Sequence, residues 1–285
     1  MKILVTGYNG QLGYDVVQEG LKQGLTMVGI DREDLDLTIN TDVETFVREM
    51  HPDAIIHCAA YTAVDKSEED RESCWNVNVS GTEYLAAIAK EIDAKFIYIS
   101  TDYVYDGEGQ TPFVETDTPN PQGYYGVTKY EGEKKVRELI EKHFIIRTSW
   151  VFGMNGQNFI KTMLKLAETR NELNVVGDQI GSPTYTYDLA VLLIDMIQSE
   201  KYGLYHASNE GFCSWSDLAT ESFKQAGKEI KVNAINTEEY PTPAVRPKNS
   251  RMSKQKLLDN GFKQLPPWQD AVKRYVAELQ LEVKS

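Results

Sequence analysis

Two residues of the segment PQGYYGVTKYEGEKK (121–135) have the spacing of a proton-transfer pair. Each residue of a helix turns the side chain by about 100°, so residues four positions apart share a face. Tyr125 and Lys129 therefore lie on one face, whereas Tyr124 and Tyr130 point elsewhere. A close ammonium favours the phenolate and is expected to bring the pKa of Tyr125 toward neutrality, which suits a group that donates and accepts a proton.

A hydroxyl group is expected beside this pair. The apolar run FIYIS (96–100) is typical of a buried strand, and it ends in Ser100 and Thr101. Ligands of open α/β sheets bind at the carboxyl ends of the strands, where such a hydroxyl could orient a carbonyl oxygen next to Tyr125. The Tyr-to-Lys spacing alone also fits an ordinary packed helix, so the strand context is what favours chemistry.

A glycine-rich turn follows the first expected strand. Gly7, Gly10 and Gly13 are spaced as GxxGxxG within GYNGQLG and precede a helical pattern. Glycines at these positions let the backbone approach a pyrophosphate, whose charge is met by N–H groups at the helix start. An ordinary glycine-rich turn is the alternative interpretation.

The end of the second strand bears on the choice of cofactor. Asp31 lies about 18 residues beyond Gly13, close to the spacing of an acid that binds the adenosine ribose of NAD. The adjacent Arg32 could instead pair with the 2′-phosphate of NADP, so both cofactors stay open. Asp36 and Leu37 are expected near the adenine, with a solvated loop as the alternative.

Alternating elements must position these residues. Buried strands are predicted at 2–6, 26–30, 54–58, 95–100 and 144–149, and helices at 12–23, 42–50, 76–91 and 126–142. This alternation predicts an α/β fold, a doubly wound parallel sheet of the Rossmann type.

The second half of the chain has a looser pattern. It predicts helices at 158–170, 187–198 and 215–226, an extended segment at 173–184 and a strand at 203–207. We expect a dinucleotide-binding domain at 1–150 and, at 151–285, mainly a second, smaller α/β lobe for the substrate. Segments near 175–205 and 235–255 are expected to return to the first domain.

Composition excludes several classes of partner. The 285 residues include 43 acidic and 30 basic side chains, a net charge of −13, which argues against a nucleic-acid or anionic-membrane surface. Cys58, Cys74 and Cys213 form no CxxC motif, so neither disulfides nor a metal site are expected and a reducing cytoplasm fits. The sequence shows no export signal and no membrane span.

Seven segments, taken together, resemble a known family. They are GYNGQLG (7–13), CAAYTAVDKSE (58–68), STDYVYDG (100–107), YGVTKYEGE (125–133), RTSWVFG (147–153), NFIKTM (158–163) and RPKNSRM (246–252). The chain is similar to the extended short-chain dehydrogenases/reductases and, among them, to the dTDP-4-dehydrorhamnose reductases.

The resemblance implies an activity and a cofactor site. Thr101, Tyr125 and Lys129 would be catalytic, and NADPH or NADH would reduce the C4 keto group of dTDP-4-dehydro-L-rhamnose to give dTDP-L-rhamnose. The implied cofactor-binding residues are Gly7, Asn9, Gly10, Gln11, Leu12, Asp31, Arg32, Asp36, Leu37, Ala59, Ala60, Tyr61, Ser100, Tyr125 and Lys129. Asn78 would be a hydrogen-bonding residue inside a helix.

The resemblance also implies a nucleotide-sugar site. Thr62, Asp102, Tyr103, Val104 and Trp150 would lie near the sugar; Asn158, Gln179, Arg246 and Ser250 would lie near the nucleotide. Arg246, Lys248 and Arg251 form a basic cluster that could hold a diphosphate, with a solvated loop as the alternative.

The chain departs from the family pattern at a few positions. Tyr105 replaces a frequent phenylalanine and would place a hydroxyl near the sugar. Asp15 and Tyr187 stand where some members have metal-binding glutamates. The resemblance therefore implies neither a bound metal nor a metal-bridged dimer for this chain. The choice between monomer and homodimer stays open.

Three other functions found on the same fold have requirements that differ from those of reduction. A nucleotide-sugar 4,6-dehydratase needs a second carboxyl group after Asp102, where this chain has Tyr103. A sugar epimerase would retain its dinucleotide through turnover. A noncatalytic, NADP-binding regulatory subunit like that of methionine adenosyltransferase would oxidise no NADPH with any keto-sugar.

Overall fold

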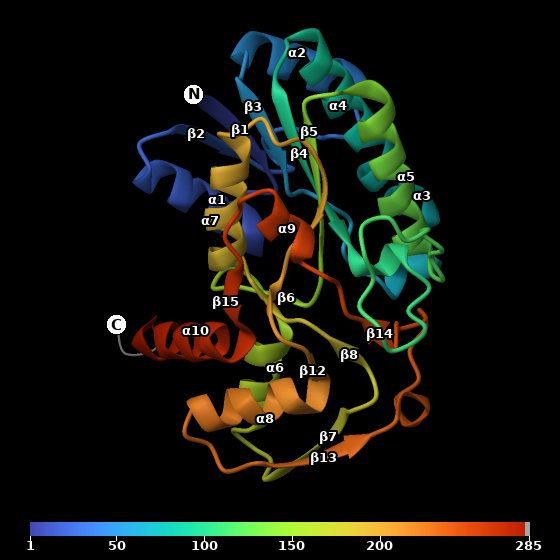
Figure 1. Ribbon diagram of the computed structural model, residues 1–285, viewed down its shortest axis with the longest axis vertical. Coiled ribbons are helices and arrows are strands. Elements are labelled where there is room, and N and C mark those ends of the chain that lie inside the picture. Colours follow the sequence, from blue (N-terminus) through green and yellow to red (C-terminus); the bar gives the residue numbers. More distant parts are fainter. Residues whose placement is uncertain (283–285) are drawn as a thin grey trace.

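A six-stranded parallel sheet lies at the centre of the larger lobe (Figure 1). The computed structural model describes residues 1–282. The strand order is β10-β5-β4-β3-β1-β2. The strands are β1 (Lys2–Thr6), β2 (Thr26–Ile30), β3 (Ala54–His57), β4 (Lys95–Thr101), β5 (His143–Thr148) and β10 (Gly203–His206). The inner strands are buried on both sides, which explains their continuous apolar runs.

Helices cover both faces of this sheet (Figure 1). Ile3 and Val5 belong to the core shared with α1 (Gln11–Lys22) and α7 (Thr186–Ile197). Leu4 and Ile55 point to the other side, and the helices there are α2 (Asn40–Met50), α4 (Gly81–Glu91) and α5 (Tyr124–Leu139). The predicted doubly wound Rossmann-type sheet is confirmed.

The helical stretch before α4 is not uniform. It consists of α3 (Arg71–Trp75) and a π-helical turn, η2 (Asn76–Ser80), that runs directly into α4. Such turns are rare and frequently occur at functional sites. Here the turn carries the buried Asn78.

A smaller lobe lies below the sheet in Figure 1. In it β7 (Glu172–Val176) pairs in parallel with β13 (Lys231–Ile235), and α6 (Phe159–Leu166) and α8 (Trp215–Gln225) share a core with this pair. Helix α10 (Trp268–Glu282) packs against α8. The expected smaller α/β lobe is therefore present.

The remaining elements of the described chain are short. They are η1 (Lys66–Glu68), η3 (Asp102–Val104), β6 (Val151–Phe152), β8 (Ile180–Gly181), β9 (Thr184–Tyr185), β11 (Asn209–Glu210), β12 (Cys213–Ser214), η4 (Thr237–Glu239), β14 (Asn249–Ser250), α9 (Gln255–Asp259) and β15 (Leu265–Pro267). Within residues 1–282, no helix has both the length and the hydropathy needed to cross a membrane.

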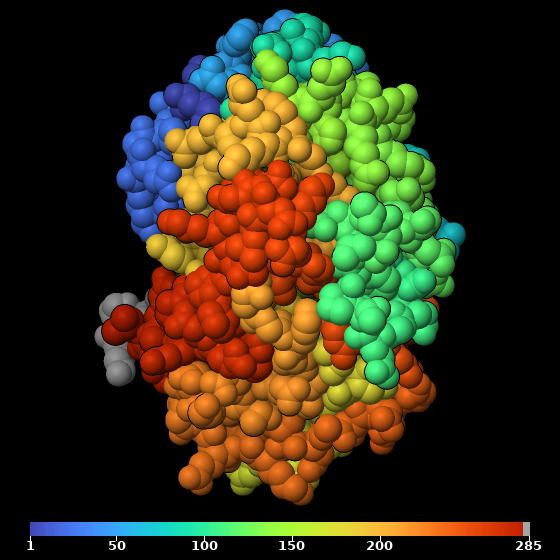
Figure 2. All heavy atoms as spheres, in the orientation of Figure 1, coloured from blue at the N-terminus to red at the C-terminus, as the bar shows by residue number. Residues whose placement is uncertain are grey.

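The chain passes between the lobes more than once. Helix α7 and strand β10 are part of the large lobe, whereas β14 pairs with β8 outside the central sheet. The 106–120 segment, blue-green in Figure 2, lies beside orange-red C-terminal residues, and Phe113 forms a bridge with Met252. The domain division at residue 150 stays a prediction.

Candidate active site

A cavity of about 1070 Å³ opens at the carboxyl edge of the central sheet. The strand order reverses at β1, which has β2 on one side and β3 on the other. Ligands of open α/β sheets bind at this point of reversal. All residues that the sequence analysis assigned to the cofactor line the cavity: Gly7, Asn9, Gly10, Gln11, Leu12, Asp31, Arg32, Asp36, Leu37, Ala59, Ala60, Tyr61, Ser100, Tyr125 and Lys129.

The loop between β1 and α1 is shaped for a group that approaches the backbone closely. Gly7 has φ +70°, in the left-handed region. A Cβ atom on Gly13 would lie 2.2 Å from the Gly7 carbonyl oxygen, so only glycine fits there. Helix α1 begins at Gln11 with no side-chain cap and no acidic residue in its first turn. Its N–H groups and the positive end of its dipole are therefore available to an anion such as a pyrophosphate.

The wall beyond β2 offers charges of both signs. Asp31 and the exposed Arg32 are adjacent in the chain and both line the cavity, so this wall accommodates a ribose hydroxyl or a 2′-phosphate. The Asp36 carboxylate accepts hydrogen bonds from the Thr38 hydroxyl at 2.7 Å and the Thr38 N–H at 2.9 Å. These bonds lower the pKa of Asp36 and keep it an acceptor at the cavity wall.

The loop after β3 is held by Asn78. Its side-chain oxygen accepts from the Tyr61 N–H at 2.8 Å, and its amide nitrogen donates to the Tyr61 carbonyl at 3.2 Å. The same nitrogen donates to the Thr128 hydroxyl at 3.0 Å, in α5. The π-helical turn thus ties the Ala59–Tyr61 wall to the helix that carries Tyr125.

Thr101, Tyr125 and Lys129 meet at one end of this cavity. Thr101 ends β4, and its side chain lies close enough to Tyr125 to lower the pKa of that phenol. Its hydroxyl donates to the Asp102 carboxylate at 3.0 Å. Tyr125 and Lys129 lie one turn apart in α5. Tyr124 is not among the cavity residues, and its ring instead contacts the Arg71 guanidinium at 4.9 Å. The structure therefore separates the two adjacent tyrosines as the helical spacing predicts.

The pKa of Tyr125 moves in the direction opposite to the prediction. Burial raises it, Asp102 and Tyr103 raise it further, and the nearby Thr101 side chain lowers it. The expectation that Lys129 brings the pKa of Tyr125 toward neutrality is wrong for this structure, because burial removes the phenolate from water and Lys129 is not among the groups that lower this pKa. At neutral pH Tyr125 is a protonated phenol, the form that donates a proton.

Lys129 is almost completely enclosed. Its side chain is 2% exposed, and its ammonium lies 4.1 Å from the centre of the Tyr98 ring. Burial lowers the pKa of Lys129 to about 7, and the charge of Glu133 acts in the opposite direction. The lysine therefore changes its charge in the physiological range.

Four residues predicted to contact the sugar line the cavity near Tyr125: Thr62, Asp102, Tyr103 and Trp150. Burial raises the pKa of Asp102 to about 6, although the nearby Ser250 side chain and the hydrogen bond from the Thr101 hydroxyl, at 3.0 Å, lower it. Trp150 has φ +49°, unusual for a bulky residue, and stacks on Trp215 with ring centres 3.8 Å apart. Backbone conformations of this kind concentrate at functional sites.

Two residues of the same segment lie away from the cavity. Val104 is fully buried in a cluster with Tyr105 and Met252, so the prediction that it contacts the sugar does not match its position. Tyr105 is also buried, and its hydroxyl oxygen accepts from the Arg147 Nη1 at 2.6 Å. The expectation that this hydroxyl faces the sugar is therefore wrong.

The residues predicted to lie near the nucleotide are spread over several places. Asn158 caps α6 by accepting from the Lys161 N–H at 3.0 Å, and it donates to the Gln11 side chain at 3.0 Å, tying the small lobe to the glycine loop. Gln179 accepts from the Trp215 indole at 3.1 Å and is 6% exposed. Neither residue lines the large cavity, and Ser250 is buried and does not line it either.

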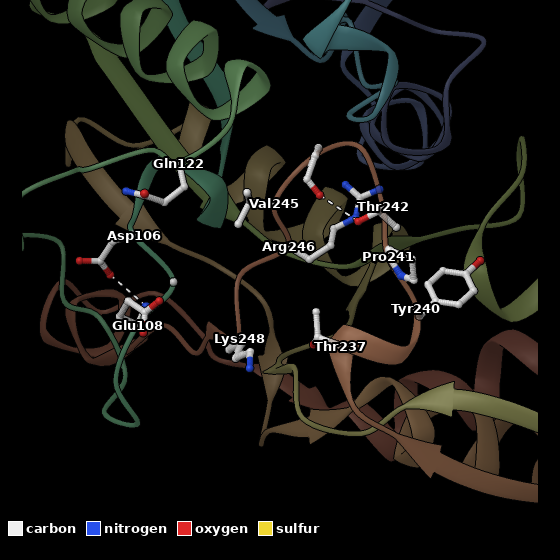
Figure 3. A pocket seen from close by; sticks show the side chains of 12 residues that line it. Asp106, Glu108, Gln122, Thr237, Tyr240, Pro241, Thr242, Val245, Arg246 and Lys248 are labelled. Atoms are coloured by element: carbon white, nitrogen blue, oxygen red, sulfur yellow. Dashed lines mark hydrogen bonds between the residues drawn. The ribbon is translucent and has the colours of Figure 1, made fainter.

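A second cavity, of about 310 Å³, adjoins this region (Figure 3). Arg246 and Lys248 both line it. Arg246 also donates to the Tyr103 hydroxyl at 3.3 Å, so it lies between the two cavities. The third member of the predicted basic cluster, Arg251, instead donates to Asn249 at 3.0 Å.

The chain is similar to known proteins over nearly its whole length. Residues 1–281 match the family model described as the RmlD substrate binding domain. The chain belongs to this family.

Full-length relatives support the assignment to the RmlD family. The dTDP-4-dehydrorhamnose reductase of Escherichia coli (strain K12) is 40% identical, with 98% of each chain covered. The spore coat polysaccharide biosynthesis protein SpsK of Bacillus subtilis (strain 168) is 38% identical, with 97% of each chain covered.

Solved structures support the same family assignment. The dTDP-4-dehydrorhamnose reductase from Clostridium acetobutylicum ATCC 824 is 43% identical and has a TM-score of 0.96, covering 98% of this chain and 100% of that one. The reductase from Bacillus anthracis str. Ames, solved in complex with NADP, is 42% identical with a TM-score of 0.95, covering 97% and 99%. A UDP-glucose 4-epimerase from Thermus thermophilus, 22% identical, shares the fold at a TM-score of 0.85 and covers 98% and 99%.

Several residues around the site were not predicted from the sequence. Glu68 accepts a hydrogen bond from the Tyr124 N–H at 2.8 Å and so fixes the start of α5, and Asp65 pairs with Arg246 at 2.6 Å. These contacts join residues far apart in the chain, and no local pattern indicates them. Glu133 had a usable signal, because it follows Lys129 by one more turn on the same face of α5.

Proposed function

We propose that this protein reduces the C4 keto group of dTDP-4-dehydro-L-rhamnose, with NADPH as the hydride donor, to give dTDP-L-rhamnose. The observation that carries this proposal is the convergence of Thr101, Tyr125 and Lys129 on a cavity that begins at the glycine loop. The names of the relatives support the substrate, and the NADP in the Bacillus anthracis structure supports the cofactor.

The residues present fit a nicotinamide dinucleotide. The glycine loop leaves no room for a Cβ atom at Gly13, and the uncapped start of α1 suits the pyrophosphate. Asp31, Arg32 and Asp36 would hold the adenosine end, and Lys129 would hold the nicotinamide ribose. When bound, the reduced cofactor supplies the hydride for C4.

The protein supplies the proton. Tyr125 is protonated at neutral pH, so its hydroxyl can donate to the C4 oxygen as that oxygen gains negative charge. The Thr101 hydroxyl, which lies beside Tyr125, would orient the same oxygen. The phenolate left on Tyr125 would be stabilised by the Lys129 ammonium one helical turn away.

The diphosphate of the substrate needs local cations, because the chain as a whole carries a net charge of −13. Arg246 and Lys248 in the second cavity are the proposed source (Figure 3). Both are ion-paired in this structure: Arg246 with Asp65 at 2.6 Å and Lys248 with Glu238 at 2.7 Å. A bound diphosphate would have to replace these carboxylates as the partner.

The proposal is tested by following absorbance at the reduced-nicotinamide band with dTDP-4-dehydrorhamnose and either NADPH or NADH. We expect oxidation of the cofactor that depends on the keto-sugar, and faster oxidation with NADPH. No oxidation with this or any other keto-sugar would support a noncatalytic subunit. Dinucleotide released from the purified protein on denaturation, without net oxidation in the assay, would support an epimerase.

A further inference from the structure

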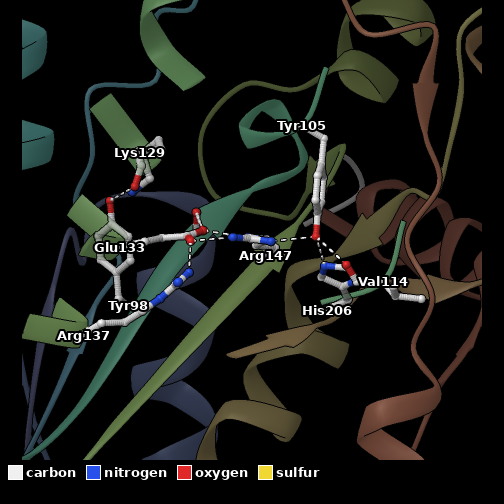
Figure 4. A network of polar contacts seen from close by, with 9 residues as sticks. Tyr98, Tyr105, Val114, Lys129, Glu133, Arg137, Arg147 and His206 are labelled. Carbon is white, nitrogen blue, oxygen red and sulfur yellow. Dashed lines mark hydrogen bonds and ion pairs between the residues drawn. The ribbon is translucent and has the colours of Figure 1, made fainter. Parts of the chain in front are cut away.

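The catalytic face of α5 continues into the protein beyond Lys129. Tyr125, Lys129 and Glu133 follow one another at intervals of four residues and so lie along one face. Glu133 is 0% exposed, whereas Glu131 and Glu138 on the same helix are not buried. Figure 4 shows Glu133 at the centre of a network of polar contacts, one turn beyond Lys129.

The Glu133 carboxylate is fixed by three side chains. Arg147 makes two contacts, Nε to Oε1 at 2.8 Å and Nη2 to Oε2 at 2.6 Å. Arg137 adds a bond to Oε2 at 2.7 Å, and the Ser100 hydroxyl donates to Oε1 at 2.6 Å. Two-point pairing with a guanidinium sets both the position and the plane of a carboxylate. The carboxylate therefore has one defined place, directly behind the strand end that carries Thr101.

Arg147 is itself fixed from its other side. It is 1% exposed, and its Nη1 donates to the Tyr105 hydroxyl at 2.6 Å. That hydroxyl lies 2.7 Å from Nε2 of His206, whose Nδ1 lies 3.1 Å from the Ser253 carbonyl. Because a carbonyl oxygen only accepts, Nδ1 carries the hydrogen and Nε2 accepts from Tyr105. Hydrogen bonds that run from His206 in β10 through Tyr105 and Arg147 therefore fix the position of the Glu133 carboxylate.

Glu133 acts on the charge of Lys129 from one turn further along α5. The groups that raise the pKa of Lys129 are Glu133 first, then Cys74 and Cys58. Burial raises the pKa of Cys58 to about 12 and also raises that of Cys74, so both thiols are neutral at physiological pH. Tyr98, whose ring lies under the ammonium, and Tyr125 are protonated for the same reason. Among these groups, only Glu133 provides negative charge.

We propose that Glu133 is a positioning residue of the active site: its buried carboxylate, held by Arg147 and Ser100, keeps Lys129 an ammonium beside Tyr125. This role deepens the proposed reductase function and rests on it for its catalytic consequence. Without that carboxylate, burial would leave Lys129 neutral at physiological pH, and the phenolate formed on Tyr125 would lose its counter-charge.

The test compares Glu133→Gln with Glu131→Gln in the full chain. Both changes remove one carboxylate from α5, but Glu131 pairs with Lys134 at the surface of the helix. The charge state of Lys129 is followed directly, by NMR titration of isotope-labelled lysine side chains, with Lys129→Met identifying the signal. Removing a close opposite charge should lower the midpoint for Lys129 by about one pH unit in Glu133→Gln and leave it unchanged in Glu131→Gln.

Activity provides the second readout. The pH at which kcat/KM for NADPH declines on the alkaline side should fall by the same amount as the Lys129 midpoint in Glu133→Gln. A Lys129 midpoint equal to that of the wild type would overturn the proposal, even if turnover is lost. If the wild-type protein reduces no keto-sugar, the proposed function fails, and the NMR titration still decides the link between Glu133 and Lys129.

Glu133→Gln leaves Arg147 buried without its carboxylate, and this can prevent folding. The double variant Glu133→Gln/Arg147→Gln removes buried charges of both signs and keeps hydrogen-bonding groups at both positions. Its Lys129 midpoint should lie below that of Arg147→Gln, which keeps the Glu133 carboxylate and its bonds with Arg137 and Ser100. Equal midpoints in these two folded variants would refute the role of Glu133.

Discussion

Gly13→Ala is predicted to weaken NADPH binding about 30-fold while the protein stays folded. The added Cβ atom would lie 2.2 Å from the Gly7 carbonyl oxygen and 2.7 Å from its carbonyl carbon, and both atoms belong to the backbone. Side-chain carbons essentially never come closer than 3.0 Å, so the loop must move by about 0.8 Å.

That displacement is enough to lose one hydrogen bond between a backbone N–H and a phosphate. Hydrogen bonds to charged groups contribute about 2 kcal/mol, which corresponds to about 30-fold in Kd. The dissociation constant is measured by the change in NADPH fluorescence on binding, and folding is checked by thermal unfolding without ligand.

Gly20→Ala is the matched control in the same helix. Its Cβ atom would lie 2.3 Å from Sδ of Met27, a flexible side chain outside the cavity that can move aside. NADPH affinity should therefore stay at the wild-type value. The reasoning about the loop is refuted if Gly13→Ala binds NADPH as tightly as the wild type, or if both variants lose affinity equally.

Three further outcomes are expected. Tyr105→Phe removes the acceptor of Arg147 Nη1 and should lower the free energy of unfolding by about 1–3 kcal/mol, measured by urea denaturation, with little change in turnover. A variant as stable as the wild type would contradict the role of this hydrogen bond in the network. The kcat/KM for NADPH should decline as pH rises through about 7, because Lys129 loses its proton there, and a flat profile from pH 6 to 9 would contradict this assignment. Asp65→Asn frees Arg246 for the diphosphate and should lower KM for the nucleotide sugar up to about fivefold, as expected for a partly exposed ion pair; a higher KM would contradict it.

The sequence was most informative where the site depends on local spacing. The glycine loop and the Tyr125–Lys129 pair each lie within one turn or helix, so their geometry follows from the backbone. The strands were predictable because burial on both faces of a parallel sheet requires continuous apolar runs. Helix α10 is absent from the elements that the sequence predicts, although Ala271, Val272 and Tyr275 have helical spacing and are buried.

Long-range contacts explain what the sequence did not reveal. Val104 and Tyr105 follow Asp102, but the η3 turn directs both side chains into a core formed with the distant Met252. Asn158 contacts Gln11 across the lobes, which no local pattern indicates. The pKa of Tyr125 depended on how deeply the folded chain buries the ring, and spacing along the helix gives no measure of that.

The most direct test of the proposed chemistry is the turnover of Tyr125→Phe beside that of Tyr124→Phe, measured with NADPH and dTDP-4-dehydrorhamnose. Loss of the proton donor should lower kcat by about 10²–10⁴-fold in Tyr125→Phe, with NADPH affinity and thermal stability near the wild-type values. Tyr124→Phe should keep nearly full turnover, because that ring lies outside the cavity. Equal turnover in the two variants, or an active Tyr125→Phe, would contradict the assignment of Tyr125 as the proton donor.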